Sequence, residues 1–310
     1  MSDNQNMPIT EDLFERVGIQ KNRAEDLSKP ALTYWADVWR RFRENKLAFL
    51  GLIILVLVIV VLYLGPLING SDYQFINEMD RNQGPSMKHW FGTDTMGRDL
   101  FTRICHGGRV SILIGVMCTG VMFVFGSILG SIAGFKGGVV DDVIMRICEI
   151  VNNIPYLVLV IILSMVMGRS LFALVFAMSF LSWTGTTRMV RGQILQIKEL
   201  DYVQASTALG GGTAHIIFKH LIPNTLGIIM VTITMSVPGF IFGEAFLSYI
   251  GLGIEAPATS WGALAAAGQE RMMFYPHELF FPCLFMVLTI LSFHLIGDGL
   301  SDALDPKLRK

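Results

Sequence analysis

The 310-residue sequence has few charged residues for its length. Asp, Glu, Lys and Arg make up 16% of the chain, against about 25% in an ordinary soluble domain, whereas hydrophobic residues make up 52%. The formal net charge of -1 gives no electrostatic basis for binding nucleic acid, so none is expected as a partner. This composition favours a membrane protein over one or two soluble domains.

The sequence also has only four cysteines and lacks a common nucleotide-binding pattern. None of the four cysteines stands in a CxxC pair, so neither a disulfide framework nor a zinc site is expected. The sequence has no GxxxxGK[ST] loop, which ATPases use to hold phosphates and magnesium. We therefore expect no enzyme activity, cofactor or metal in this chain. All four cysteines are predicted to be thiols that pack against other side chains: Cys105, Cys118, Cys148 and Cys283.

Long uncharged runs dominate the rest of the sequence. A hydrocarbon core about 30 Å thick needs about 20 helical residues, with about 17 as the lower bound. The runs that meet this are Leu47–Ser71, Val110–Phe135, Ile150–Gly168, Leu171–Thr187, Leu221–Gly243 and Leu279–Gly297. We predict an all-α membrane protein with six transmembrane helices in residues 47–300. Only Arg169 and Ser170 separate the short third and fourth runs, so a tight turn must join them.

Basic residues indicate the orientation of the chain. With the N-terminus inside, 17 of the 24 Lys and Arg residues fall in inner segments, which places both termini in the cytoplasm. Residues 1–46 are predicted as a cytoplasmic tail, flexible over 1–30, and residues 301–310 as a second tail. Leu32 to Lys46 indicates a helix in the inner interface, with aromatic residues toward lipid, or an ordinary basic flank. No apolar signal segment precedes the first run, so that run is expected to be an uncleaved anchor.

A polar segment lies between the fourth and fifth apolar runs, on the cytoplasmic side. It reads DYVQASTALGGGTAHIIFKHLIPN from Asp201 to Asn224. Asp201 and Thr213 are candidate caps of two short helices, and the glycines at 210–212 can end the first. Pro223 is predicted to separate the pair from the fifth span. A helix-turn-helix of this kind suits docking into a groove of a soluble partner, and a solvated loop is the alternative.

This hairpin resembles the EAA loop of permeases in ATP-binding-cassette (ABC) importers, here residues 199–224. The loop has the pattern Glu-Ala-Ala, three residues, Gly, nine residues, Ile-x-Leu-Pro, and the spacing matches throughout. Gln204, Ser206 and His220 stand where Glu, Ala and Ile are usual, and the missing glutamate removes a charge from the expected ATPase contact. The residues that the resemblance assigns to ATPase coupling are Gln204, Ala205, Ser206, Gly210, His220 and Pro223.

Three further blocks extend the resemblance over nearly the whole chain. HWFGTDTMGRDLFTRICHGGRVSI, EAFLSYIGLGIEAPATSWG and the C-terminal GDGLSDALDPKLRK are similar to blocks of peptide-importer permeases. They resemble the C-type permease of oligopeptide and dipeptide ABC importers, although Ser301 and His294 replace the usual Arg and Asn. The resemblance implies a type I importer architecture, multi-pass in the bacterial cytoplasmic (inner) membrane.

The same resemblance implies partners and cargo. A related B-type permease would complete a heterodimer, and one or two cytoplasmic ABC ATPases would bind ATP and Mg. An extracytoplasmic substrate-binding protein would deliver the peptide substrate. The chain itself would form half of the translocation pathway across the lipid bilayer.

Further polar residues are candidates for function. Asp94, Arg98 and Asp99 form a charged group on the outer side, with Asp94 as a candidate helix cap; the group can also contact the binding protein or gate the outer mouth. Glu244 follows the fifth run, where an acidic residue either lines the pathway or is solvated at the interface. Residues 247–268 form a candidate re-entrant loop. Near the last run, three carboxylates are expected to be structural: Asp298, Asp302 and Asp305.

Two other classes of protein are alternatives. A secondary transporter would carry coupling-ion groups in its spans and often an inverted repeat, and neither is evident. A non-transporting anchor or receptor subunit would need a soluble domain, but the longest outer loop, residues 72–109, has only 38 residues. Among ABC permeases, nickel or another non-peptide solute is the alternative cargo.

Overall fold

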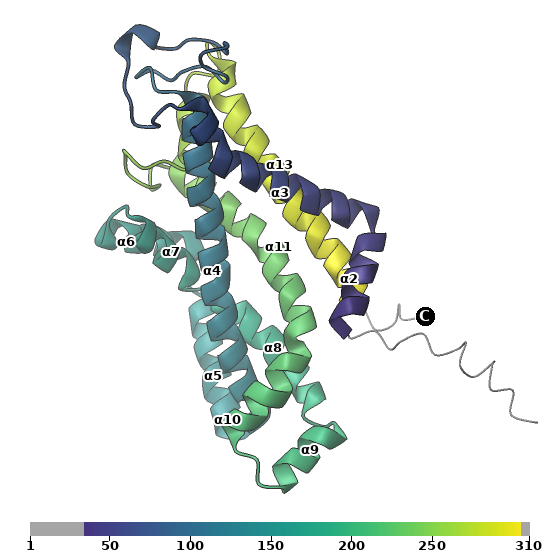
Figure 1. The fold of residues 1–310 in the computed structure, drawn as a ribbon. Helices are drawn as coiled ribbons and strands as arrows, with labels where there is room; N and C mark the ends of the chain where they lie inside the picture. Colours follow the sequence, from purple (N-terminus) through teal and green to yellow (C-terminus); the bar gives the residue numbers. More distant parts are fainter. Residues whose placement is uncertain (1–33, 305–310) are drawn as a thin grey trace, which may run out of the picture.

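A computed structural model describes residues 34–304, and every regular element in that part of the chain is helical (Figure 1). The elements in chain order are α2 (Tyr34–Glu44), α3 (Lys46–Asn69), η2 (Glu78–Asp80), α4 (Leu100–Lys136), α5 (Gly138–Asn152), α6 (Tyr156–Met167), α7 (Leu171–Ser179), α8 (Trp183–Ile197), α9 (Asp201–Ala208), α10 (Thr213–Ile216), η3 (Ile217–Leu221), α11 (Ile222–Tyr249), α12 (Trp261–Gln269) and α13 (Pro276–Leu304). The tail predicted at residues 1–30 lies outside the described residues. The C-terminal tail does so only from residue 305, because α13 includes residues 301–304.

Four helical stretches are long and apolar enough to cross a membrane. They are α3, α4, the unbroken stretch from α10 to α11, and α13. A fifth candidate exists if α5 and α6, which are bent by 82° at their junction, count as one span. The described residues thus form an all-helical protein with four or five candidate spans, and the count of six stays a prediction.

The third apolar run does not form the single helix predicted over residues 150–168. α5 begins at Gly138, before the run, and ends at Asn152. Pro155 follows, and the residue before a proline disfavours helical backbone, so the chain bends before α6. The prediction was wrong here because a count of uncharged residues does not locate a bend.

The fourth run is also divided. Residues 180–182 separate α7 from α8, so the single helix predicted over residues 171–187 is wrong. Thr184 and Thr187 are buried and bond to carbonyls of the preceding turn, Thr187 to Trp183 at 3.0 Å. The tight turn predicted at residues 169–170 lies between α6 and α7, as expected.

α4 is the central helix, and α3, α7, α8, α11 and α12 all pack on it. Its closest neighbour is α8, against which it presents glycines at every fourth position. A Cβ atom at Gly126, Gly130 or Gly134 would lie 2.5–2.8 Å from Thr186, Thr187 or Ile194. Small residues at this spacing let two helix backbones approach closely. The sequence analysis did not single out this pattern.

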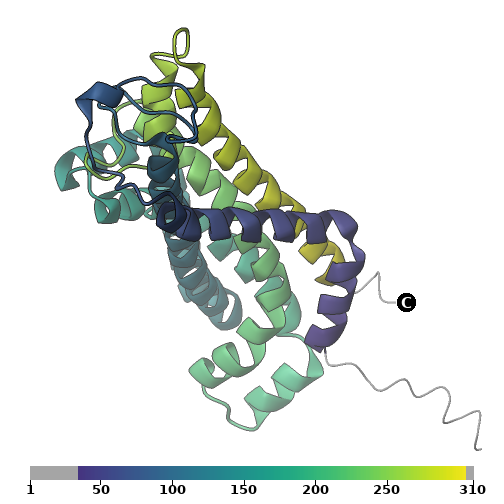
Figure 2. The same cartoon turned by 45° about the horizontal axis from the view of Figure 1, so that its top comes forward.

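The helices separate toward one end of the molecule. We call the end with residues 70–99 and α12 the loop end, and the end with residues 199–216 the hairpin end. At the loop end α3, α4 and α13 lie close together; from there α3 and α13 run to one side, and α4, α5 and α8 to the other (Figures 1 and 2). The hairpin therefore belongs to the α4–α8 side.

α2 begins the described chain and packs on the end of α13. Val38 and Phe42 are buried in a cluster with Ala303, whereas Trp35 and Trp39 are exposed. The aromatic face predicted for this helix is therefore divided, because Phe42 contacts protein rather than solvent or lipid. α2 lies in the segment predicted as an interfacial helix.

Candidate functional site

The hairpin begins with two short helices, α9 and α10, separated by a glycine turn. Gly210 has φ +82°, a left-handed backbone that glycine adopts without strain. Val203, Ile216, Ile217 and Leu221 are buried in one cluster with Ile194 of α8 and other residues. One face of the hairpin is thus fixed to the spanning helices.

The opposite face of the hairpin is exposed and partly apolar. The exposed fraction is 89% for Leu209 and 62% for Phe218. Gln204, Ala205, Gly210 and Pro223 are also exposed, and Ser206 and His220 are half-buried. All six predicted coupling residues therefore retain surface that a partner could contact. Leu209 and Phe218 add exposed apolar surface to this face.

The charges of the hairpin are unpaired within the described residues. Gln204, in the position where a glutamate was expected, donates to the backbone carbonyl of Glu199 at 3.2 Å. No ion pair among residues 34–304 involves a side chain of residues 199–224, so Asp201 and Lys219 keep their charges available for a partner.

Three local predictions for the hairpin are wrong. Leu200 rather than Asp201 holds the N-cap position of α9, and Gly212 rather than Thr213 holds that of α10; neither helix has a side-chain cap. Pro223 does not separate the hairpin from the fifth span, because α10, η3 and α11 are continuous. η3 is a π-helical turn just before Pro223, which lacks the N–H of an α-helical hydrogen bond.

α8 joins the hairpin to the bundle. Besides the glycine contacts with α4, Arg191 of α8 makes a two-point ion pair with Asp141 of α5, with Nε to Oδ1 at 2.5 Å. Guanidinium–carboxylate pairs of this form fix orientation as well as distance. The ion pair and the glycine contacts thus fix α8 to both α5 and α4.

At the loop end, the predicted charged group falls into two parts. Asp94 accepts from Arg98 at 2.8 Å and Arg103 at 2.6 Å, and from the backbone N–H of Met96 and Arg98. Asp94 is therefore not the helix cap that the sequence suggested. Asp99 caps α4 by accepting from the N–H of Thr102 at 2.9 Å.

Asp99 also ties the long loop 70–99 to the helices. Its carboxylate meets His89 Nδ1 at 2.9 Å and Asn69 Nδ2 at 3.1 Å. Elsewhere in the loop, the Lys88 ammonium lies 2.6 Å from the Asp80 carboxylate and lowers the pKa of that carboxyl. Polar contacts, together with the packing of Trp90 and Phe91 on Phe101 of α4, thus hold this loop on α4. A role of Asp94, Arg98 and Asp99 toward a partner stays a prediction.

Glu244 is fully buried, with an exposed fraction of 0%. Its carboxylate accepts from three serine hydroxyls, Ser111 at 3.1 Å, Ser248 at 2.7 Å and Ser260 at 2.5 Å. The expectation that water solvates it at an interface is therefore wrong. A pathway-lining role stays a prediction, and in this structure the carboxylate faces hydroxyl groups from α4, α11 and the cap of α12.

The Glu244 cluster docks α12 among the longer helices. Ser260 Oγ accepts from the N–H of Ala263 as the N-cap of α12, and Ser111 Oγ accepts from the N–H of Trp261. Trp261 is fully buried and donates to the carbonyl of Ile104 at 3.0 Å. The second half of the candidate re-entrant segment, residues 247–268, is thus packed between helices, as a re-entrant element would be.

Arg109 is a further residue that the sequence analysis missed. Pro66 interrupts α3 and has no N–H, so the carbonyl of Leu62 lacks its helical donor. Arg109 supplies donors instead, with Nε at 2.8 Å and Nη2 at 2.6 Å from that oxygen. Its guanidinium also lies 4.7 Å from the ring centre of Tyr63. The sequence signal for this contact was a proline in one apolar run and an arginine directly before the next.

The remaining predicted residues have structural surroundings. All four cysteines are free, and three of them are buried, as expected of packing residues. Asp302 accepts from Asn45, the N-cap of α3, at 3.3 Å rather than from a basic side chain. Asp305 lies outside the described residues. Among residues 34–304 no group of three His, Cys, Asp or Glu side chains could hold a metal ion.

Helices of membrane-crossing length, a docked short helix and a partly exposed hairpin define a multi-pass helical membrane protein. A family model described as "Binding-protein-dependent transport system inner membrane component" matches residues 126–310. A second model, "N-terminal TM domain of oligopeptide transport permease C", matches residues 33–85. The chain belongs to the family of binding-protein-dependent transport system inner membrane components.

Relatives cover nearly the whole chain. The oligopeptide transport system permease protein OppC of Bacillus subtilis (strain 168) is 46% identical over 306 residues, which are 99% of this chain and 100% of that protein. The dipeptide transport system permease protein DppC of the same organism is 46% identical over 293 residues, 94% and 92% of the two chains. The glutathione transport system permease protein GsiD of Pectobacterium atrosepticum is 36% identical over 282 residues, 91% and 94%.

Proposed function

We propose that this chain is a permease subunit of an ATP-driven peptide importer in the bacterial cytoplasmic membrane. With a related permease it forms the translocation pathway, and cytoplasmic ATPases drive it through the hairpin of residues 201–224. The hairpin carries the proposal: its position matches the family's coupling loop, it exposes apolar side chains, and it lies between α8 and α11, continuing without a break into α11. The names of the relatives, which transport oligopeptides, dipeptides and glutathione, support peptide as cargo.

The proposed architecture has six spans. If α5 with α6 and α7 with α8 each cross the membrane as one bent span, the described chain begins and ends on the same side, in line with the contact between α2 and α13. The excess of basic residues then assigns the hairpin end to the cytoplasm and the loop end to the outside.

Coupling follows from the packing of α8. Closure of two ATPases around ATP and Mg moves the docked hairpins, and each hairpin moves α8. Because the glycines of α4 are in close contact with α8, the two helices shift together and change the opening of the pathway. An external binding protein delivers the peptide to the loop end, and the loop 70–99 is the surface nearest to it.

The test is purification of this chain from its native membranes in mild detergent. A second permease and one or two P-loop ATPases are expected to co-elute. Replacing both Leu209 and Phe218 by Glu should release the ATPases and leave the second permease bound. Val139→Glu, an exposed residue of α5 outside the hairpin, is the matched control and should release nothing. A chain that elutes alone and still moves solute in vesicles without ATP would instead be a secondary transporter.

A further inference from the structure

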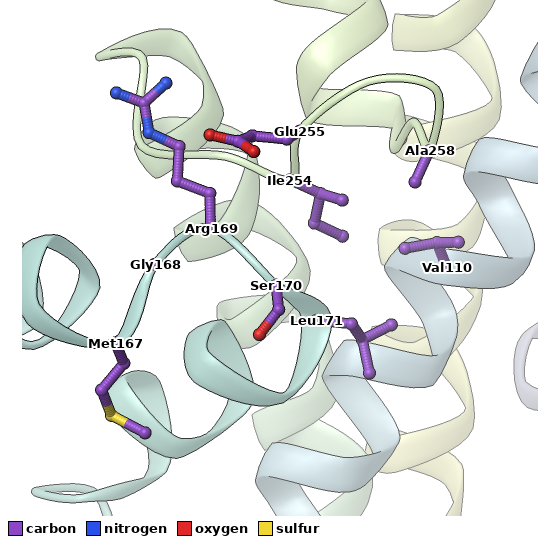
Figure 3. A pocket seen from close by; sticks show the side chains of 9 residues that line it. All are labelled: Val110, Met167, Gly168, Arg169, Ser170, Leu171, Ile254, Glu255 and Ala258. Carbon is purple, nitrogen blue, oxygen red and sulfur yellow. The ribbon is translucent and has the colours of Figure 1, made fainter.

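A cavity of about 430 Å³ lies at the loop end of the molecule (Figure 3). It is formed by the turn between α6 and α7, by Val110 of α4 and by the segment that precedes α12. Its volume falls within the range of about 300–1,000 Å³ typical of sites for small organic ligands. None of the residues assigned above to coupling or to the charged group lines it.

Two opposite charges stand at one end of this cavity. Figure 3 shows the side chains of Arg169 and Glu255 at the same end, on neighbouring segments. Their backbones are linked, since the N–H of Glu255 donates to the carbonyl of Arg169 at 3.3 Å. Within residues 34–304, however, no hydrogen bond or ion pair involves the guanidinium of Arg169 or the carboxylate of Glu255. Arg169 of the turn and Glu255 of the neighbouring segment thus carry complementary charges, and both are unpaired within the described residues.

The other end of the cavity is apolar. The side chains of Val110, Leu171 and Ile254 gather there, with Ala258 beside them (Figure 3). A ligand that fills the cavity would therefore place a hydrocarbon group between these residues and its charged groups beside Arg169 and Glu255. A metal ion would leave the apolar end without a matching group, and a nucleotide would place its phosphates beside the Glu255 carboxylate.

We infer that this cavity is a subsite for a dipeptide with an apolar side chain. The Arg169 guanidinium pairs with the peptide carboxylate, and the Glu255 carboxylate pairs with the peptide ammonium. The apolar side chain lies between Val110, Leu171 and Ile254. This inference rests on the proposed function, which brings peptides to the loop end. It adds that this chain selects among them by the size of one side chain.

The first experiment tests the apolar end. Val110→Phe fills it, and Leu113→Phe places the same ring one turn along α4, on an exposed position outside the cavity. Uptake of leucyl-leucine and of glycyl-glycine is measured in cells that carry the complete transporter with each variant. In the Val110 variant the ratio of the two uptake rates should fall about tenfold, because glycyl-glycine needs no apolar space. The Leu113 control should keep the wild-type ratio.

A second filling variant, Ala258→Val, guards against misfolding of the first. It lies in the segment before α12 and should lower the same ratio, by about threefold. A zwitterionic phospholipid headgroup is the rival ligand, because its phosphate and its ammonium complement Arg169 and Glu255 as the peptide termini do. If lipid occupied the cavity, filling it would change both uptake rates equally and leave the ratio unaltered, which would overturn the inference.

The second experiment tests the charges. Arg169→Gln and Glu255→Gln should each lower leucyl-leucine uptake about fivefold at subsaturating peptide, since a charge-assisted hydrogen bond is lost. Saturating peptide should restore the rate, because the variants weaken binding and leave coupling intact. Arg81→Gln removes an exposed arginine of the loop 70–99 and should have no effect. Wild-type uptake at every peptide concentration in both variants would overturn the inference.

Deletion of this chain separates the two proposals. If the deletion leaves peptide uptake unchanged, the proposed function itself is wrong. If the deletion abolishes uptake but the cavity variants behave like wild type, only the peptide subsite is wrong.

Discussion

The two ends of the molecule are held together in different ways. At the loop end, buried polar groups distant in sequence bond to one another, as Glu244 does with Ser111 and Ser260. At the hairpin end, glycine contacts fix α8 on α4, and the hairpin itself makes no ion pair among the described residues. Removing one member of a buried hydrogen-bond network leaves its partners unpaired and lowers the free energy of unfolding. An exposed hairpin, by contrast, can be altered without disturbing the bundle. One end is thus held by buried polar contacts, whereas the other end leaves a hairpin exposed.

The largest effect is expected from a side chain inserted between α4 and α8. In Gly130→Val the new Cβ would lie 2.6 Å from the carbonyl oxygen of Thr187 and 2.9 Å from Val190 Cβ. Overpacking of this kind costs about 3 kcal/mol, so the chain should unfold at markedly lower temperature and transport should be lost. Gly120→Val, on the same helix with nothing within 4 Å, is the control. Equal melting temperatures in detergent would mean that the two helices are not closely joined.

Removal of the buried carboxylate should come next. Glu244→Ala leaves three serine hydroxyls without their acceptor and opens a cavity, at a cost of about 2–3 kcal/mol. Glu244→Gln keeps an acceptor oxygen and should cost less. Glu270→Ala removes an exposed carboxylate at the end of α12 and should have no effect on thermal unfolding in detergent. If Ala and Gln at position 244 were equally mild, the loop end would not depend on this network.

A smaller effect is expected at the link between α3 and α4. Arg109→Ala leaves the carbonyl of Leu62 without a donor, at a cost of about 1–2 kcal/mol. Pro66→Ala restores the helical N–H for that carbonyl, so the cost of Arg109→Ala should shrink in the Pro66→Ala background. A double-mutant cycle of unfolding free energies measures this coupling directly. Additive costs would show that Arg109 does not substitute for the missing helical donor.

The most local effect on stability is expected at the hairpin. Gly210→Val forces a β-branched residue into a left-handed backbone, which costs about 1–2 kcal/mol and distorts only the turn. Global melting should change little, while uptake is lost and ATP hydrolysis by the complex continues. Gly212→Val tests an exposed neighbour whose φ of -67° suits any residue. Wild-type uptake in the Gly210 variant would remove this turn from the coupling mechanism.

Sequence reasoning succeeded where a signal is local. The uncharged runs at residues 47–71 and 110–135 lie largely within α3 and α4, because about 20 apolar residues in a row suffice to indicate a span. The left-handed turn at Gly210 also follows from glycine alone. The bends near Pro155 and at residues 180–182 were missed, since the same apolar composition suits straight and bent helices.

The candidate sites also divide into those with a local sequence signal and those without one. The six residues proposed for coupling were assigned from a spacing pattern within 20 residues of chain, and their role stays a prediction. Glu244 was noticed from its position beside an apolar run, but its partners were not, because Ser111 lies 133 residues away. Gly126, Gly130 and Gly134 show a spacing that is visible in sequence, yet nothing in the sequence indicates that α8 is the helix they face.

The sequence by itself determined that the chain is helical, membrane-spanning and interrupted by a hairpin, because these properties depend on hydrophobicity and backbone preferences of neighbouring residues. Only the tertiary structure decided which polar groups meet. Ser111, Glu244 and Ser260 come together because α4, α11 and α12 pack at one place, and Arg169 and Glu255 flank one cavity for the same reason. Hydrogen bonds and cavities depend on positions within a few ångströms, which packing sets and local sequence does not.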